Sequence, residues 1–443
     1  MNKNQVSIIM KEKLNTAINE VCQNPWLFAI NPGADFTRTR KMPIRELLRA
    51  IFGMRGNSLN KELYDYFKDR DEHITASAFV QQRAKLLPEA CKYIFQAFNN
   101  ACLDTKTYKG YHLYAVDGTD LNIARNENSP TYFPPQKNQD VGNNRFHANA
   151  LYDLLNRTYK DVYVQPSPYQ QERDAALVMI VISRLSGKDI VIADRGYQSY
   201  NFFEYLNRIG VKYVVRIKDN DLVELKRLPN MEYDKDVSIE LRTTQTKADR
   251  EAFAAGTAKW IAGHSKNGKT KKQVSWDFES PFLFRYRCVR FEITTGVYET
   301  LVTNLSRDEF PLEEMKDLYH MRWGIETSFR ELKYAIGLVN FHARKEEYIL
   351  QEIYARLTIY NFCERITTAV VIMQSRASNK HAYQVNYTMA IHICVDFFRC
   401  NSPNAPPDVE KTIRRYVLPV RPGRQDKRKM TAKGYVFFMY RVA

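Results

Sequence analysis

The sequence lacks any long uncharged hydrophobic run. Its most apolar region, from about Ile349 to Met373, is interrupted by four charged residues: Glu352, Arg356, Glu364 and Arg365. A membrane-spanning helix needs about 20 consecutive, mostly apolar residues, so we expect no spanning segment. The N-terminal stretch MNKNQVSIIMKEKLN contains too short an apolar run for a secretory signal peptide. We therefore expect a cytoplasmic protein without a membrane partner.

Paired cysteines are also missing. The seven cysteines are odd in number, are scattered along the chain and form no CxxC pair: Cys22, Cys91, Cys102, Cys288, Cys363, Cys394 and Cys400. This pattern argues against a disulfide framework and against a structural zinc site. We interpret these residues as reduced thiols of the core.

Acidic residues are too few to balance the basic ones. Asp and Glu together number 50, against 66 Lys and Arg, which gives a formal net charge of +16. Such an excess predicts an anionic partner, and nucleic acid is the usual one when a membrane surface is disfavoured.

Residues 1 to about 105 have the pattern of a wholly helical region. Ser58 is a plausible N-cap with Glu62 in the first turn of the helix that it would begin, and Ser77 is able to cap another helix. Short helices with polar and basic faces are compatible with a helix-turn-helix reader of DNA. A plain helical bundle explains the same pattern, and the sequence leaves both interpretations open.

From Tyr108 onward the pattern changes to strands. The run YHLYAVDGTDLNI is rich in β-branched and aromatic residues, and Asp117, Gly118 and Thr119 read as a turn that ends it. The stretches FHANALYDLLN and TYKDVYVQP predict a hairpin. A helix over about 170–185 and the buried strand of KDIVIADRGY follow, with Asp194 at the carboxyl end of that strand. This order predicts an α/β fold: a mixed sheet with helices on both faces.

The second half of the chain predicts an interruption of this sheet. Residues from about 219 to 297 are polar and turn-rich, and we expect a β-rich antiparallel insertion there. YETLVTNL then returns to the core as a strand, and Asp317–Leu338 reads as one helix without proline. Long apolar helix is expected up to about Cys400. The predicted divisions are as follows in chain order. Residues 1–105 form a helical N-terminal DNA-binding domain, 106–218 and 298–400 are the two parts of the catalytic core, 219–297 are the insertion between them, and 401–443 are a basic tail.

Two aspartates and one glutamate are the candidate catalytic residues. Asp117 and Asp194 each follow a predicted inner strand of one sheet, and groups at neighbouring strand ends converge on the functional crevice. With Glu326 from the helix 317–338, three carboxylates could hold two hard divalent ions of the kind used in phosphoryl transfer. As an alternative, either Asp is an ordinary turn former. Asp120 lies close enough to Asp117 in the sequence to be mistaken for it.

One stripe of the helix 317–338 carries charge suited to a phosphate backbone. At about 100° per residue, five residues fall on one narrow face: Tyr319, Arg322, Glu326, Arg330 and Lys333. Cations would hold phosphates and the carboxylate would hold a metal ion against them. A solvated face laced with ion pairs is the alternative.

Three motifs resemble those of a known family. AVDGTDL, IADRGY and the signature Y-x2-R-x3-E-x6-K, which falls on Tyr319, Arg322, Glu326 and Lys333, are similar to motifs of bacterial insertion-sequence transposases of the Asp-Asp-Glu class. The resemblance is to the group named for insertion sequence four, with relatives in transposons five and ten. It extends to the N-terminal FTRTRKMPIRELL and TASAFVQQRAK and to the basic C-terminal region.

The resemblance implies a ribonuclease-H-like core and an enzyme that uses two Mg²⁺ ions, with Mn²⁺ as a substitute. It implies double-stranded DNA partners, namely terminal inverted repeats and target DNA, and a homodimer on paired ends. Excision through a hairpin, with a flipped base stacked on an aromatic, is expected. The metal ligands would be Asp117, Asp194 and Glu326.

The resemblance gives roles to some residues beside the metal ligands, and position in the sequence gives roles to others. Tyr319, Arg322 and Lys333 would contact phosphates, whereas Arg330 is included from the helical wheel alone. Arg195 and Tyr197 would orient Asp194 or contact DNA, and His147 is expected to be structural. For base stacking the candidates are Trp260 and Trp276, which lie in the insertion, and Trp323 beside Arg322. An inactive transposase relative that only binds DNA as a repressor, or a nuclease without strand transfer, are the alternatives.

Overall fold

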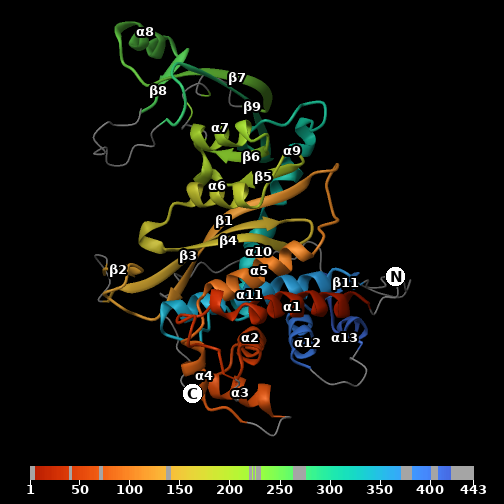
Figure 1. Cartoon of the computed structure of the whole chain (residues 1–443). Helices are drawn as coiled ribbons and strands as arrows, with labels where there is room; N and C mark the ends of the chain where they lie inside the picture. Colours follow the sequence, from red (N-terminus) through yellow and green to blue (C-terminus); the bar gives the residue numbers. More distant parts are fainter. Residues whose placement is uncertain are drawn as a thin grey trace.

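A computed structural model gives the fold of most of the chain. It describes residues 5–38, 42–68, 73–135, 141–218, 222, 225, 231–262, 276–370, 382–400 and 408–420. Parts of the expected insertion and most of the expected basic tail lie outside the described residues. Helices gather at one end of the molecule, a sheet runs through its middle, and further strands form the opposite end (Figure 1).

The N-terminal part is helical, as its periodicity predicts. The helices are α1 (Gln5–Gln23), α2 (Ile44–Gly53), α3 (Leu59–Phe67), α4 (Ala76–Arg83) and α5 (Glu89–Ala101). Ser58 caps α3, because its hydroxyl accepts a hydrogen bond from the backbone N–H of Lys61. The expected cap at Ser77 is wrong. The cap is Thr75, two residues before Ser77: its backbone is extended, and its hydroxyl accepts a hydrogen bond from the backbone N–H of Ala78.

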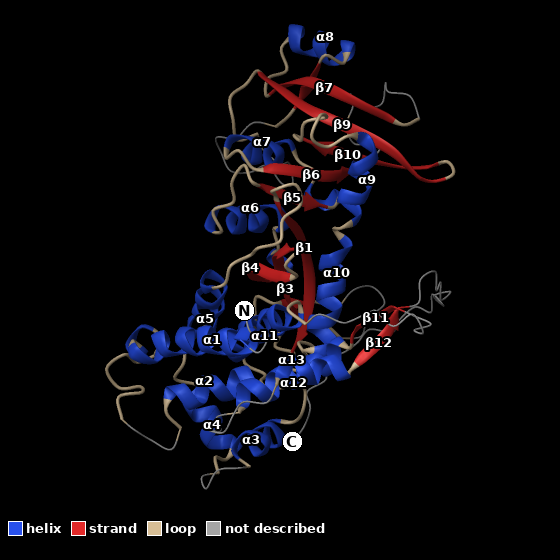
Figure 2. Cartoon of the chain, turned by 90° about the vertical axis from the view of Figure 1, so that its right-hand side faces the viewer, coloured by secondary structure: helices blue, strands red, loops and turns tan. Residues whose placement is uncertain are grey.

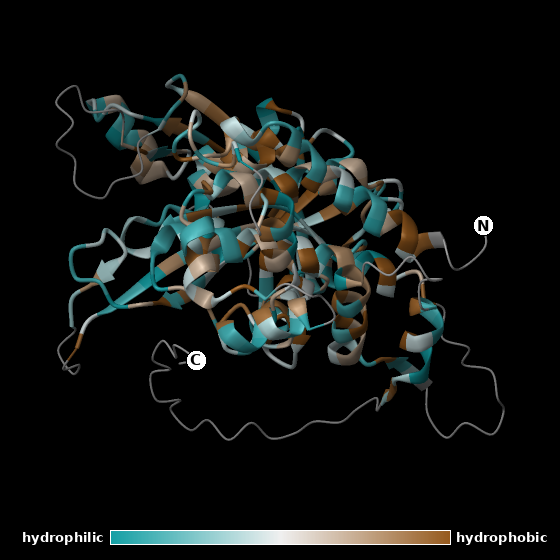
Figure 3. Cartoon of the chain, turned by 60° about the horizontal axis from the view of Figure 1, so that its bottom comes forward, coloured by the Kyte–Doolittle hydropathy of each residue, from teal (hydrophilic) through white to brown (hydrophobic). Residues whose placement is uncertain are grey.

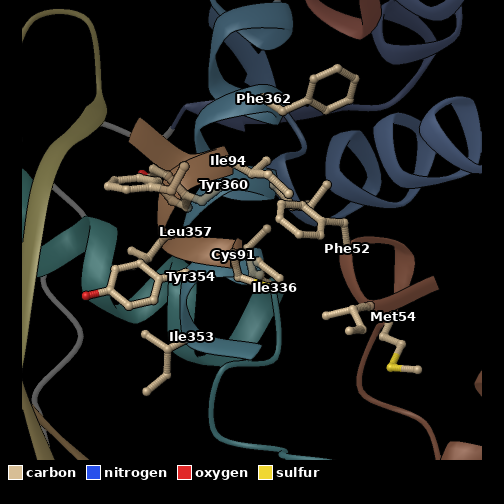
Figure 4. Packing of buried hydrophobic residues seen from close by; sticks show 14 of the residues in the cluster. Phe52, Met54, Cys91, Ile94, Ile336, Ile353, Tyr354, Leu357, Tyr360 and Phe362 are labelled. Carbon is tan, nitrogen blue, oxygen red and sulfur yellow. The ribbon is translucent and has the colours of Figure 1, made fainter. Parts of the chain in front are cut away.

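These helices share one core with helices from the far end of the sequence. The 22-residue α11 (Glu346–Thr367) is buried along most of its length, and α12 (Tyr387–Arg399) packs beside it. In Figure 4, Phe52 of α2, Ile94 of α5 and Tyr360 of α11 lie together, each at most 1 % exposed. Residues about 50, 90 and 360 positions into the chain therefore form one apolar cluster.

The central sheet has the mixed order that the sequence predicts. β4 (Thr158–Pro166), β3 (Asn143–Asp153) and β1 (His112–Ile123) pair antiparallel, and β5 (Asp189–Ala193) and β6 (Lys212–Ile217) continue from β1 in parallel. The short β2 (Tyr132–Phe133) pairs with the start of β3. This arrangement confirms the ribonuclease-H-like fold class.

Helices cover both faces of this sheet. α6 (Glu172–Ile182) and α7 (Tyr200–Arg208) lie on one side, and α9 (Leu312–His320) and α10 (Trp323–Arg330) lie on the other (Figure 2). Two apolar clusters match these faces, one containing Val116 and Val191 and the other containing Leu113 and Ile190. Hydrophilic and hydrophobic residues alternate along the helices, as expected of elements with one buried side (Figure 3).

The strand expected to return to the core does so, because β10 (Val297–Thr303) pairs antiparallel with β6. Strands of the expected insertion extend the same sheet: β9 (Phe282–Thr294) pairs with β10 and β7 (Tyr233–Arg242) pairs with β9, both antiparallel. The short β8 (Ala258–Trp260) pairs parallel with β7. Between β7 and β8 lies α8 (Lys247–Ala255), begun by a capping box of Thr246 and Asp249 that the sequence analysis overlooked.

Two expectations for the second half are wrong in part. The helix expected over 317–338 is divided: a turn at Met321 separates α9 from α10, and residues Glu331–Ala335 form a π-helix closed by Gly337 at a φ of 89°. The apolar helix expected up to Cys400 is also interrupted. β11 (Ala382–Val385) pairs with β12 (Val417–Val420), with α12 and α13 (Val409–Arg415) between them.

Among the helices of the described ranges, none combines the length and the apolar character needed to cross a membrane.

Candidate active site

Asp117 and Asp194 lie on neighbouring strands. β1 and β5 run parallel with Val116 opposite Ala193, so the residue that follows each of these two is one of the aspartates. The turn expected at Asp117 is wrong, because β3 continues to pair with β1 as far as Ile123. The parallel pairing with β5 nevertheless ends just before Asp117, which leaves both carboxylates at the same edge of the parallel strands.

Local backbone donors fix both carboxylates. Oδ1 of Asp117 accepts a hydrogen bond from the N–H of Gly118 at 2.8 Å. Oδ1 of Asp194 accepts one from the N–H of Gly196, also at 2.8 Å, in the turn that follows β5. Each carboxylate is therefore held by the glycine that follows it, and its second oxygen is left for other partners.

Glu326 is linked to Asp117 through Arg322. The guanidinium of Arg322 donates to Oε1 of Glu326 at 2.7 Å, one helical turn away, and its other terminal nitrogen lies 3.6 Å from Oδ2 of Asp117. Arg322 is only 5 % exposed. Helix α10 approaches the residue that follows β3 closely, since a methyl group at Gly324 would lie 3.0 Å from the side chain of Leu154. Two of the three candidate carboxylates, those of Asp117 and Glu326, thus share one buried guanidinium.

The surroundings of Asp117 shift the pKa of its carboxyl group. Burial raises the pKa of its carboxyl group to about 6, and the negative charges of Asp194 and Glu326 raise it further, against the hydrogen bond from Gly118 and the charge of Arg322. The raised pKa of Asp117 therefore reports mainly burial, with a smaller contribution from the two neighbouring carboxylates that the charge of Arg322 opposes.

The donor set fits a hard divalent cation by its chemistry. Carboxylate oxygens are the ligands that Mg²⁺ and Mn²⁺ take in proteins, and clustered carboxylates gain from a cation between them. Within the described ranges, no three His, Cys, Asp or Glu side chains are grouped closely enough to hold one metal ion. Arg322, which bridges Asp117 and Glu326, supplies the positive charge in this arrangement.

The stripe expected on the helix 317–338 is only partly exposed. Tyr319 is 1 % exposed and packs in the core between the sheet and α9. Lys333 turns back to the sheet, where its Nζ donates to the backbone carbonyl of Asp120 at 3.0 Å. Arg330 is exposed. The division of the helix, and the π-helix that carries Lys333, explain why a regular wheel does not describe the face.

The remaining predicted residues separate by exposure. Arg195 is exposed beside Asp194, whereas Tyr197 is buried at 1 %. Trp323 is 53 % exposed, and the guanidinium of Arg322 lies 5.2 Å from the centre of its ring. Trp276 is 2 % exposed and donates from Nε1 to the carbonyl of Glu279, so it is a core residue.

Trp260, at the end of β8, is partly buried. Of the three tryptophans considered for base stacking, Trp323 is therefore the one that is both exposed and adjacent to the carboxylate cluster.

A second polar cluster lies against the same strands. His147, on β3, is 5 % exposed, and its two ring nitrogens face Asp120 of β1 and Glu172 of α6. Asp120, considered above as an alternative to Asp117, is instead bound to His147, Arg145 and Ser167. Sequence reasoning missed Glu172, whose only local signal is its place in the first turn of a helix.

Comparisons with known proteins cover much of this region. Residues 108–362 match the family described as "Transposase DDE domain". A "Transposase for insertion sequence element IS231B" from Bacillus thuringiensis subsp. berliner is 23 % identical over 48 % of each chain. A "Transposase for insertion sequence element IS231D" from Bacillus thuringiensis subsp. finitimus is 22 % identical over 62 % of each chain.

The chain spans about half the length of the first of these relatives. Among solved structures, it is similar to a piggyBac transposase synaptic complex with hairpin DNA. That similarity has a TM-score of 0.47 at 10 % identity and covers 95 % of this chain and 87 % of the other.

Proposed function

Because this chain belongs to the transposase DDE domain family, we propose that it is the transposase of an insertion sequence. It cuts the ends of its element by metal-dependent phosphoryl transfer and joins the freed 3′-OH ends to target DNA. The observation that supports this proposal is that Asp117 and Asp194 follow paired residues of β1 and β5, while Asp117 is linked to Glu326 of α10 through the buried guanidinium of Arg322.

The three carboxylates are the proposed holders of two Mg²⁺ ions, for which Mn²⁺ would substitute. When bound, such ions activate an attacking oxygen and stabilise the leaving one. The raised pKa of Asp117 supports this assignment, because it marks a buried carboxyl group with two acidic neighbours, whose ionised form a bound cation would stabilise.

The proposed DNA contacts come from the signature region and from the turn after β5. Arg322 lies between two of the carboxylates, where a scissile phosphate would be held, and Arg330 and Arg195 are exposed nearby. Lys333 and Tyr319 complete the proposed phosphate contacts; Lys333 is partly buried and Tyr319 is buried. Trp323 offers an exposed indole for stacking with a flipped base at the break, in keeping with excision through hairpins.

The proposal includes the assembly and the DNA partner. A homodimer would hold two terminal inverted repeats, each bound in part by the helical region 1–105. Phosphate contacts of this kind supply affinity and a strong dependence on salt, whereas the choice of end sequence requires contacts to base edges.

The test is cleavage of duplex DNA that carries the element's own inverted repeats, with Mg²⁺, analysed on a denaturing gel. Wild type should give nicked and hairpin products and, with a target plasmid, joined products. Asp194→Asn should give none while it still binds the duplex. Asp308→Asn, at an exposed aspartate in the loop before α9, is the matched control and should cut like wild type.

Binding without cleavage by wild type, with either Mg²⁺ or Mn²⁺, would replace this proposal with a DNA-binding repressor. Cleavage without joining would replace it with a nuclease.

A further inference from the structure

His147 lies between two carboxylates that come from different elements. Its Nδ1 is 2.8 Å from Oδ1 of Asp120 on β1, and its Nε2 is 3.1 Å from Oε1 of Glu172 on α6. Burial lowers the pKa of the imidazole, but the two carboxylates outweigh it and raise the pKa to about 9. At neutral pH the imidazole is therefore protonated, and it lies between the carboxyl groups of Asp120 and Glu172.

This cluster contacts the backbone that carries Asp117. Successive strand residues point to opposite faces, so Gly118 and Asp120 face α6 while Asp117 faces α10. A methyl group at Gly118 would lie 2.2 Å from Nε2 of His147 and 3.1 Å from Oε1 of Glu172. The imidazole is therefore packed directly against the backbone next to Asp117, from behind the sheet.

The same cluster reaches the backbone that carries Asp194. A methyl group at Gly196 would lie 3.6 Å from Oε2 of Glu172 and 3.0 Å from Oδ1 of Asp194. The carboxylate of Glu172 thus stands between the glycine that holds Asp117 and the glycine that holds Asp194.

Asp120 fixes the other side of the cluster. Its carboxylate accepts from Arg145 at 2.6 Å and from the hydroxyl of Ser167 at 3.0 Å, and its backbone carbonyl accepts from Lys333. The cluster is therefore joined to the segments that carry all three candidate ligands, since Lys333 lies in the π-helix that continues α10.

We propose that His147 is a positioning residue of the candidate metal site, which acts with Glu172 to hold the segments of Asp117 and Asp194 at the separation that a divalent cation requires. The proposal rests on the proposed function. His147 contacts neither substrate nor cation; it acts through Gly118, and Glu172 acts through Gly118 and Gly196.

The test measures binding of Mn²⁺ alone to the full chain, from the free Mn²⁺ signal in electron paramagnetic resonance. Wild type should bind Mn²⁺, and Asp117→Asn should remove that binding. Residues that orient metal ligands contribute about 10- to 100-fold to metal affinity, so His147→Asn should weaken binding about 10-fold or more. His73→Asn, at an exposed histidine, is the matched control and should bind like wild type.

A double-variant cycle separates positioning from general damage. Glu172→Gln alone should weaken Mn²⁺ binding, and His147→Asn with Glu172→Gln should bind about as weakly as the weaker single variant, because both act through one contact. The midpoint of thermal unfolding without metal reports folding separately. If His147→Asn fails to fold, Glu172→Gln, which keeps the side-chain volume, carries the test.

The outcomes are distinct. Wild-type Mn²⁺ binding that Asp117→Asn removes, with His147→Asn or Glu172→Gln folded and unchanged in affinity, would overturn the positioning role alone. Additive losses in the double variant would also overturn it. Wild type without Asp117-dependent Mn²⁺ binding would overturn the proposed metal site, and the positioning role with it.

Discussion

Asp117→Asn should stabilise the metal-free protein at neutral pH. The pKa of Asp117 is raised from 3.8 to about 6, and its side chain is 25 % exposed. The folded state therefore holds this proton more tightly than the unfolded state, so the stability of the wild type falls as the pH rises from about 4 to 6. A difference of roughly 2 pH units corresponds to about 3 kcal/mol above pH 6.

The measurement is the free energy of unfolding in urea, without divalent cations, at several pH values. At pH 7.5, Asp117→Asn should be about 2–3 kcal/mol more stable than wild type, because the substitution removes a charge that burial and, to a smaller extent, two neighbouring carboxylates disfavour. The advantage should shrink as the pH falls through 6 and largely disappear near pH 4. Adding Mg²⁺ should stabilise the wild type and leave the variant unchanged.

Asp308→Asn is the control for loss of an exposed carboxylate, and its stability should follow wild type at every pH. The reasoning would be refuted by an Asp117→Asn protein that is no more stable than wild type at pH 7.5. An advantage of the same size at pH 4 and pH 7.5 would refute it as well, because the cause would then not be ionisation.

Three further predictions follow from buried and charged residues. Arg83→Met should lower the free energy of unfolding by about 3–5 kcal/mol, because it removes the 2.9 Å ion pair of Glu352, whose side chain is 1 % exposed. In the same urea titration, Arg250→Met at an exposed position should have little effect. Trp276→Ala should cost about 3–5 kcal/mol by the same measurement, and equal DNA affinity of the folded variant would exclude a stacking role. Arg322→Ala should reduce the slope of log affinity for DNA against log salt by about 1, and an unchanged slope would argue against its phosphate contact.

The strand order and the family were accessible from the sequence because their signals are local. The runs around Val116 and Val191 are continuous apolar stretches, and the motifs AVDGTDL and IADRGY stand at their ends. The topology confirms the mixed sheet, and the match over 108–362 together with insertion-sequence relatives confirms the resemblance. The helical wheel over 317–338 predicted the exposed face less well, because the helix is interrupted by a turn at Met321 and continues as a π-helix from Glu331.

Contacts between distant segments were not accessible. Nothing near Glu172 in the sequence indicates that its carboxylate faces His147 and lies behind Asp117, because three elements must first pack to bring them together. The burial of Trp276 likewise depends on a cluster whose other members, such as Phe203 and Val302, come from distant elements. The sequence indicated which residue types belong to the site, while tertiary packing decides which of them face it.

The shared core of the chain's two helical regions has a consequence for biosynthesis. Ser7 donates two hydrogen bonds of 3.1 Å to Glu410, and Arg49 donates to the carbonyl of Phe398. Helices α1, α2 and α5 leave the ribosome first, yet the helices that cover their apolar sides are translated hundreds of codons later. The apolar sides of the N-terminal helices therefore stay partly exposed to solvent until α11 and α12 have been synthesised. An mRNA truncated upstream of the codons for α11 would yield a fragment with an exposed apolar surface. Proteases and chaperones recognise such surfaces, so quality control would remove the fragment before it competes with the full-length protein.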